Sequence, residues 1–146
     1  MKLVIDTNIF VSSLDPKDIF HAECYPILEK ILAFEIEALC PSLVLVEVTC
    51  VLRRRTNSEN LAIAIYKNLA QLPAINWLDI TLEVAERSSM LGSQTGLRGG
   101  DVIVLQVAEQ QGIPLCPNID ILIIKCLLLL YHCHPTDFLS GFVNSH

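Results

Sequence analysis

The sequence predicts an α/β fold in which helices cover both faces of a mainly parallel sheet. Short, continuously apolar segments alternate with longer segments that carry helical signals. Strands of a parallel sheet are buried on both faces, so they lack the alternating polar positions of a half-exposed strand. The composition agrees, because 52% of the 146 residues are hydrophobic and 18% are charged. A chain of this length is expected to form a single domain over residues 1–146, without needing disulfides or a structural metal.

Five short apolar segments are predicted to be strands. Their lengths suit buried strands, and turn or cap residues such as Pro41 and Asp6 follow them. In chain order, the predicted strands are residues 3–5, 36–40, 75–80, 113–116 and 128–132.

Cap residues, glycines and prolines set the ends of the predicted helices. Asp6 offers an N-cap after the first strand, Thr81 caps a later helix, and Gly112 closes the helix before the fourth strand. In chain order, the predicted helices are residues 9–14, 18–34, 43–55, 57–72, 82–93 and 101–111, and a helical turn starts at Pro135.

Hydropathy and charge exclude two classes of protein. The most apolar stretch, residues 119–131, is interrupted by Asp120 and Lys125, and its longest clean run is six residues, whereas a spanning helix needs about 20. Asp6 also interrupts any signal-peptide core. We therefore expect a soluble, cytoplasmic protein with no membrane partner. The net charge of −6 excludes a protein that holds nucleic acid by bulk positive charge.

The six cysteines indicate buried thiols in a reducing compartment. They form no CxxC pair, and most lie within apolar runs. Cys133 lies between His132 and His134, which are zinc-ligating residue types. Three consecutive residues cannot close a tetrahedral site alone, so no zinc site is predicted there.

Three acidic residues stand where an apolar side chain or a simple cap is expected. Asp6 follows the first strand, Glu47 interrupts an apolar helical segment, and Asp101 follows two glycines at a helix start. Each has an ordinary explanation: an N-cap for Asp6, a solvated helix rim for Glu47, and a favourable helix dipole for Asp101. A carboxylate on an apolar face nevertheless costs several kcal/mol unless its charge is compensated.

The positions of these acids predict a metal site. In an open parallel sheet the ligand site lies beyond the carboxyl ends of the strands, and all three acids are predicted near that edge. Converging carboxylates repel one another, so they need a cation to stay ionised together. Oxygen ligands without nearby cysteine or histidine favour Mg²⁺ or Mn²⁺, which polarises phosphoryl oxygens and makes hydroxide from bound water.

Five stretches form an ordered set of motifs that spans nearly the whole chain. They are LVIDTN (residues 3–8), PSLVLVEV (41–48), LRGGD (97–101), AEQQGIPL (108–115) and HPTDFL (134–139). In their order and separation they resemble the PIN-domain family, and within it the VapC-like toxins.

This resemblance implies a PIN-like, Rossmann-like three-layer α/β/α fold with a central, mainly parallel sheet. It also implies a Mg²⁺- or Mn²⁺-dependent endoribonuclease, in which Asp6, Glu47 and Asp101 match the three main acidic positions. Asn8 matches the polar residue that follows the first acid. Proteins of this kind typically form homodimers and are neutralised by a small antitoxin, so both partners are implied.

The chain departs from the family pattern at the fourth acid. The family usually has Thr-x-Asp after the strand predicted at residues 113–116, and this chain has Pro-Asn-Ile-Asp at 117–120. If the family pattern is aligned with this chain without a gap, its acidic position falls on Ile119. If the alignment is shifted by one residue, Asn118 takes the place of the threonine and Asp120 takes the place of the acid. We favour the slip, because Asp120 is otherwise a lone charge before an apolar run.

Basic residues near the acids are candidates for contacting RNA. Arg98 lies three residues before Asp101, and Arg53, Arg54 and Arg55 form a second candidate patch. The alternative for the triplet is a solvated helix C-terminus, where the dipole favours positive charge.

Two other functions remain as alternatives. A catalytically degenerate PIN domain would bind RNA or protein without cleavage, and the shifted Asp120 is the main support for it. A nucleotide-binding or phosphotransfer domain is the second, but no Gly-x-Gly-x-x-Gly or Walker sequence is present.

Residues 61–66 are apolar on more than one helical face, which indicates a surface covered by the core or by a second subunit.

Overall fold

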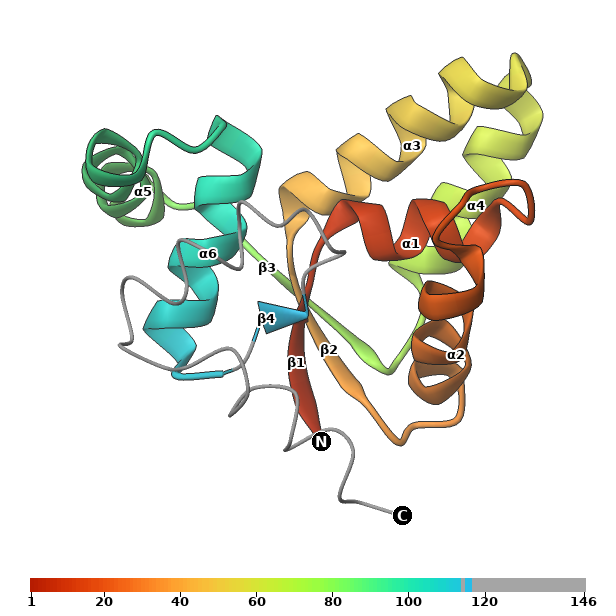
Figure 1. The fold of residues 1–146 in the computed structure, drawn as a ribbon, viewed down its shortest axis with the longest axis horizontal. Helices are drawn as coiled ribbons and strands as arrows, with labels where there is room; N and C mark the ends of the chain where they lie inside the picture. Colours follow the sequence, from red (N-terminus) through yellow and green to blue (C-terminus); the bar gives the residue numbers. More distant parts are fainter. Residues whose placement is uncertain (114, 117–146) are drawn as a thin grey trace.

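The computed structural model describes residues 1–113 and 115–116. Two helices follow each of the first three strands along this part of the chain (Figure 1). The elements are β1 (Lys2–Ile5), α1 (Thr7–Leu14), α2 (His21–Leu32), β2 (Glu37–Pro41), α3 (Ser42–Thr56), α4 (Glu59–Ala70), β3 (Ile75–Leu78), α5 (Leu82–Thr95), α6 (Gly99–Gln111) and β4 (Leu115–Cys116). The strand predicted at 128–132, the turn at Pro135, and the residues Asn118 and Asp120 lie outside the described residues.

The four strands form one parallel sheet in the order β3-β2-β1-β4. The chain first adds strands on one side of β1 and then returns to its other side with β4. Such a reversal of direction opens a crevice at the carboxyl ends of the two strands concerned, here β1 and β4. Asp6, the residue that follows β1, therefore stands at the edge where a ligand site is expected.

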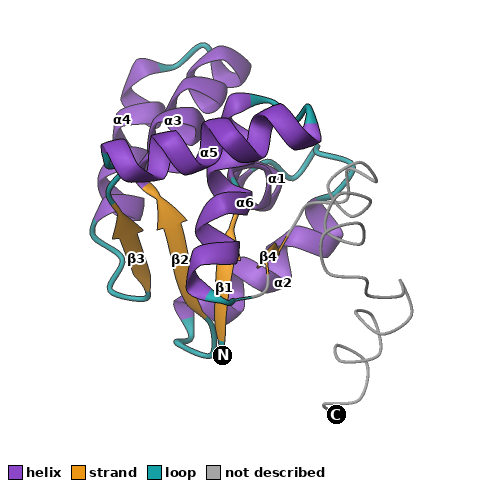
Figure 2. Cartoon of the chain, turned by 90° about the vertical axis from the view of Figure 1, so that its left-hand side faces the viewer, coloured by secondary structure: helices purple, strands orange, loops and turns teal. Residues whose placement is uncertain are grey.

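Helices cover both faces of the sheet, as the sequence predicts. Helices α1 to α4 lie on one side, and α5 and α6 lie on the other (Figures 1 and 2). Strands β1 and β2 are buried along nearly their whole length, and the largest fully buried side chains come from these two strands and from the helices. They include Phe10, Ile5, Ile9, Ile31 and Leu105. This double coverage accounts for the apolar composition.

Local cap chemistry shifts several helix ends relative to the predicted ones. Asn57 was expected to start a helix, but it adopts a left-handed conformation (φ 53°) and ends α3. The side-chain oxygen of Ser58 then accepts from the N–H of Leu61 and begins α4. Helix α6 begins at Gly99, two residues before the predicted start, so Asp101 lies inside its first turn. Thr81 and Gly112 cap helices as predicted.

The described cysteines follow the prediction in part. Cys24 and Cys40 are buried free thiols, whereas Cys50 is exposed, so the prediction of a buried thiol is wrong there. The reason is helical geometry: the buried face of α3 carries Val48 and Leu52, and a residue midway between them points to the opposite side. Within the described residues, no helix is long and apolar enough to span a membrane.

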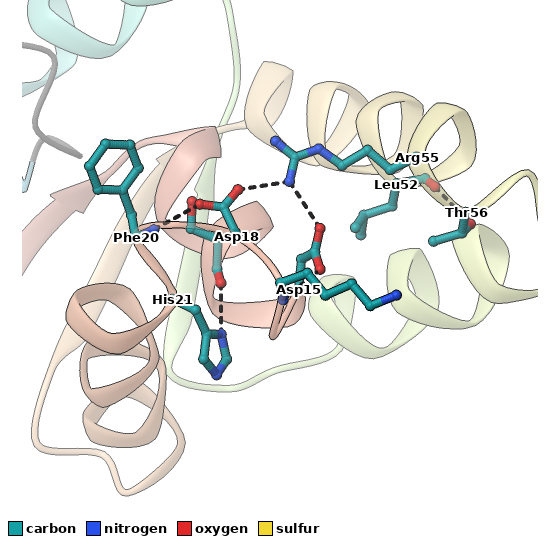
Figure 3. A network of polar contacts seen from close by, with 9 residues as sticks. Asp15, Asp18, Phe20, His21, Leu52, Arg55 and Thr56 are labelled. Carbon is teal, nitrogen blue, oxygen red and sulfur yellow. Dashed lines mark hydrogen bonds and ion pairs between the residues drawn. The ribbon is translucent and has the colours of Figure 1, made fainter.

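One arginine links α3 to the loop that follows α1. Nη1 of Arg55 lies 3.1 Å from Oδ2 of Asp15 and 2.8 Å from Oδ2 of Asp18 (Figure 3). The hydrogen bond from Arg55 is the main reason that the pKa of Asp18 lies below its ordinary value. Because the side chain of Asp18 is only 9% exposed, this contact fixes the loop more firmly than a fully solvated pair would.

Replacing Arg55 by Met should lower the free energy of unfolding by about 1 kcal/mol at pH 7. For a chain of this size, that corresponds to a fall in Tm of about 2–4 °C. Pairing lowers the pKa of folded Asp18, so its contribution is present above the unfolded value near 3.9 and is lost as the pH falls through the folded pKa. Thermal unfolding followed by circular dichroism should therefore show the two proteins converging below about pH 4.

Arg54→Met is the matched control, since Arg54 is exposed on the same turn of α3. An equal loss in both variants, or a loss in Arg55→Met that does not change with pH, would contradict the role of the pair.

Candidate functional site

Asp6 is a buried carboxylate held by the first turn of α1. It is 4% exposed and caps the helix, with Oδ1 accepting from the N–H of Thr7 at 2.7 Å. The amide of Asn8 donates to the other oxygen, Oδ2, at 3.1 Å. The expected N-cap is therefore present, and it accounts for one oxygen of Asp6. Asn8 contacts the acid that it was predicted to support.

Glu47 reaches the same region from the second turn of α3. Its Oε2 accepts a hydrogen bond from the hydroxyl of Thr7. Its Oε1 lies against Gly100, so closely that a Cβ atom on that glycine would be 2.6 Å from the oxygen. The Glu47 carboxylate is thus placed between the first turns of α1 and α6. It is half-buried, as a rim position would be, yet it points to protein atoms on two sides.

Asp101 completes a group of three acids. It is half-buried in the first turn of α6, on the same face as the buried residues Leu105 and Ala108. The pKa of Asp6 is raised, first by burial and then by the negative charges of Asp101 and Glu47. The structure therefore brings the three predicted acids close enough for each of the other two to disfavour ionisation of Asp6.

The donor set fits a hard divalent cation. All three side chains offer carboxylate oxygens, and a cation would relieve their mutual repulsion. Within residues 1–113 and 115–116, however, no three Asp, Glu, His or Cys side chains are gathered closely enough to form a ready-made metal site. The fourth predicted ligand, Asp120, lies outside the described residues, as does Asn118.

The predicted basic residues occupy two different places. Arg98 is exposed and immediately precedes α6, so it stands at the same helix start as Asp101. Arg53, Arg54 and Arg55 are exposed in the last turn of α3, about 10 Å along the helix from Glu47. Arg53 donates to Asn57 in the cap of its own helix, and Arg55 pairs with the loop after α1. Of the triplet, Arg55 thus has a structural contact that the sequence did not indicate.

Thr7 and Gly100 belong to this site, although the sequence suggested no role for either there. Thr7 stood out only as part of a capping segment, and Gly100 only as one of two glycines beside a helix start. Their contacts with Glu47 join residues 40 and more positions apart in the chain. The nearest available signal was the adjacency of each residue to a predicted acid, Asp6 or Asp101.

Comparison with known proteins identifies the family. A family model described as the PIN domain matches residues 3–116. No curated protein matches the chain significantly. Among solved structures, the chain is similar to the VapC20 toxin of Mycobacterium tuberculosis, described as cleaving the sarcin-ricin loop, with a TM-score of 0.64 and 16% identity over 76% of this chain and 84% of that one.

Two further solved structures have the same fold. A toxin–antitoxin complex from Klebsiella pneumoniae matches with a TM-score of 0.56 and 23% identity, over 77% of this chain and 82% of that one. VapBC2 from Rickettsia felis, bound to a DNA fragment from its promoter, matches with a TM-score of 0.56 and 17% identity, over 79% and 86%. These likenesses confirm the predicted PIN-like α/β fold.

Replacing Asp6 by Asn should stabilise the metal-free protein. The raised pKa of folded Asp6 means that its ionisation costs stability, and that this cost appears as the pH rises from the unfolded value, near 3.9, through the folded one. Asn caps a helix as well as Asp does, so the N-cap is kept. We expect a gain of about 1 kcal/mol at pH 7, or a rise in Tm of about 2–4 °C.

The control for this substitution is Asp79→Asn, which makes the same chemical change at an exposed acid. A thermal melt in EDTA in which Asp6→Asn is no more stable than Asp79→Asn would contradict a stability cost of ionised Asp6 in the folded protein.

Proposed function

Because the chain belongs to the PIN domain family, we propose that it is a Mg²⁺- or Mn²⁺-dependent endoribonuclease that hydrolyses phosphodiester bonds in RNA. The observation that carries the proposal is the grouping of Asp6, Glu47 and Asp101 at the carboxyl edge of the sheet, where burial and like charge raise the pKa of Asp6. A structural role gives no reason to gather three acids there, since their repulsion costs stability.

In the proposed mechanism, Asp6, Glu47 and Asp101 would hold the cation, and Asp120 is the proposed fourth ligand, with Asn118 as a supporting residue. When bound, the cation supplies charge neutralisation for the scissile phosphate and lowers the pKa of a bound water. Asn8 keeps Asp6 in place through the bond to Oδ2. A carboxylate of the group accepts a hydrogen bond from the attacking water, which orients the water and receives its proton.

RNA is proposed to approach the start of α6. Arg98 is exposed there, and the first N–H groups of a helix favour a phosphate. This local positive charge offsets a net charge of −6 at the place where the substrate must come close. A second candidate patch for RNA is the triplet Arg53, Arg54 and Arg55. Of these three, only Arg55 pairs with the loop after α1.

The protein is further proposed to be the toxin of a toxin–antitoxin pair that acts in the cytoplasm. Support comes from the similar structures, one of which is described as a toxin and another as a toxin–antitoxin complex. A candidate surface for binding a second subunit or an antitoxin lies on α4, where Leu61, Ile63 and Tyr66 are each 40–44% exposed. Exposed apolar side chains that gather on one helix commonly mark a surface that another protein chain covers.

The alternative is a degenerate PIN domain that binds RNA or protein without cleaving. It is favoured by the unusual segment around Asp120 and by the lack of a ready-made metal group among the described residues. Calorimetric titration with Mn²⁺ separates the two functions: the degenerate domain shows no binding in the millimolar range.

Replacing Asp101 by Asn should lower the rate of RNA cleavage about 100-fold or more, because it removes a ligand worth several kcal/mol in the transition state. The test is cleavage of a panel of transfer and ribosomal RNAs with Mg²⁺ or Mn²⁺, with and without EDTA. Asp79→Asn is the control and should cleave as the parent does. Cleavage that persists in EDTA, or in Asp6→Asn and Asp101→Asn alike, would refute the assignment.

Replacing Arg98 by Ala should raise KM for RNA about tenfold and leave kcat nearly unchanged, because a lost phosphate contact weakens binding without touching the reacting atoms. The salt dependence of binding should also become shallower by about one counterion. Arg54→Ala provides the comparison, since it removes the same charge from α3. If only Arg54→Ala changes KM, RNA follows the α3 patch and not the start of α6.

A further inference from the structure

The Glu47 carboxylate is enclosed by two elements other than its own helix. On one side, Oε2 accepts from the hydroxyl of Thr7 at the start of α1. On the other, Oε1 occupies the space directly above the backbone of Gly100, at the start of α6. Glu47 itself comes from α3, so its two oxygens join three helices that are distant in the chain.

Thr7 links two acids through two of its own atoms. Its backbone N–H donates to Asp6, and its hydroxyl donates to Glu47. The residue is itself buried, with 6% of its surface exposed. The relative position of the two carboxylates is therefore set through one residue of the first turn of α1.

A glycine is needed at position 100 because Glu47 occupies the space where a side chain would lie, and not because the backbone conformation there requires glycine. Its φ is not in the left-handed region, so other residues can adopt its backbone conformation. A Cβ atom there would lie 2.6 Å from Oε1 of Glu47, which is closer than real Cβ contacts come. The neighbouring Gly99 differs, because a Cβ atom on it would meet nothing within 4 Å. The two adjacent glycines therefore differ: Gly100 lies against a carboxylate, and Gly99 faces open space.

We infer that Thr7 and Gly100 are positioning residues that hold the Glu47 carboxylate in the orientation needed to bind the cation. The inference rests on the proposed metal-dependent cleavage. A hydrogen bond fixes one oxygen, and the missing side chain of Gly100 lets the other oxygen lie close to the start of α6. Residues that orient a metal ligand without touching the metal typically change affinity or activity 10–100-fold when replaced.

Gly100→Ala tests the steric half of this inference, with Gly99→Ala as its matched control. Both substitutions favour the helix, because Ala costs less backbone entropy than Gly, so neither Tm should fall. The end of a flexible Glu side chain yields more readily than a helix, so only Gly100→Ala should displace the Glu47 carboxylate. We expect Gly100→Ala to weaken Mn²⁺ binding by calorimetry and to lower kcat for RNA, each about 10–100-fold, with KM for RNA unchanged.

Thr7→Val and Thr7→Ser test the hydrogen bond. Val has the shape of Thr without the hydroxyl, whereas Ser keeps the hydroxyl and loses the methyl group. We expect Thr7→Val to weaken Mn²⁺ binding and to lower kcat about 10-fold, and Thr7→Ser to restore both. A purely structural role for Thr7 would instead make Tm the property that changes, and would make Ser the more harmful replacement because it leaves a small void.

The results distinguish failure of this inference from failure of the proposed function. If the parent protein binds Mn²⁺ and cleaves RNA while Gly100→Ala and Thr7→Val do so equally well, Thr7 and Gly100 are not positioning residues and the nuclease assignment stands. If the parent neither binds Mn²⁺ nor cleaves, the nuclease assignment fails. Crystal structures of the parent, Gly99→Ala and Gly100→Ala then decide the steric claim, which is wrong if Glu47 stays in place in Gly100→Ala.

Discussion

Repulsion among carboxylates at the carboxyl edge of the sheet is the constraint on which the rest of the site depends. Asp6 is buried directly after the central strand β1, and the charges of Glu47 and Asp101 act on it from two helices. Such an arrangement costs stability, and it persists only because the surrounding helices are held by their own packing. The apolar core under α1, α3 and α6 therefore stabilises a charged site that by itself would separate.

Three helix beginnings supply this site, and each controls one acid. The N-cap of α1 provides Asp6, the second turn of α3 provides Glu47, and the first turn of α6 provides Asp101. Helices α1 and α3 directly follow the parallel strands β1 and β2, so they start at the same edge of the sheet, and α5 returns the chain to the start of α6. The contacts of Glu47 with Thr7 and Gly100 then set how the starts of α1, α3 and α6 fit together. At the far end of α3, Arg55 joins the same helix to the loop after α1.

Much of the fold was predictable because its signals are local. Buried parallel strands appear in the sequence as continuous apolar runs. Residues such as Thr81 and Gly112 mark helix ends, Thr81 through its side-chain hydrogen bond and Gly112 through its left-handed backbone conformation. The errors also have local causes that a pattern does not reveal. Asn57 serves equally well as a helix start or as a left-handed end, and Cys50 stands among apolar residues but on the side of α3 opposite Val48 and Leu52. The left-handed cap at Asn57 decided the first case, and the position of Cys50 around the helix decided the second.

The sequence by itself determined the α/β class, the parallel sheet and the three acids, because each depends on residue type and on short-range spacing. The tertiary structure alone decided which atoms meet. It showed that Thr7 connects Asp6 with Glu47, that Glu47 lies against Gly100 and not against Gly99, and that Arg55 pairs with the loop after α1. The residues that meet in these contacts are about 40 or more positions apart in the chain. No local sequence pattern predicts such contacts, because they follow from how the helices pack on the sheet.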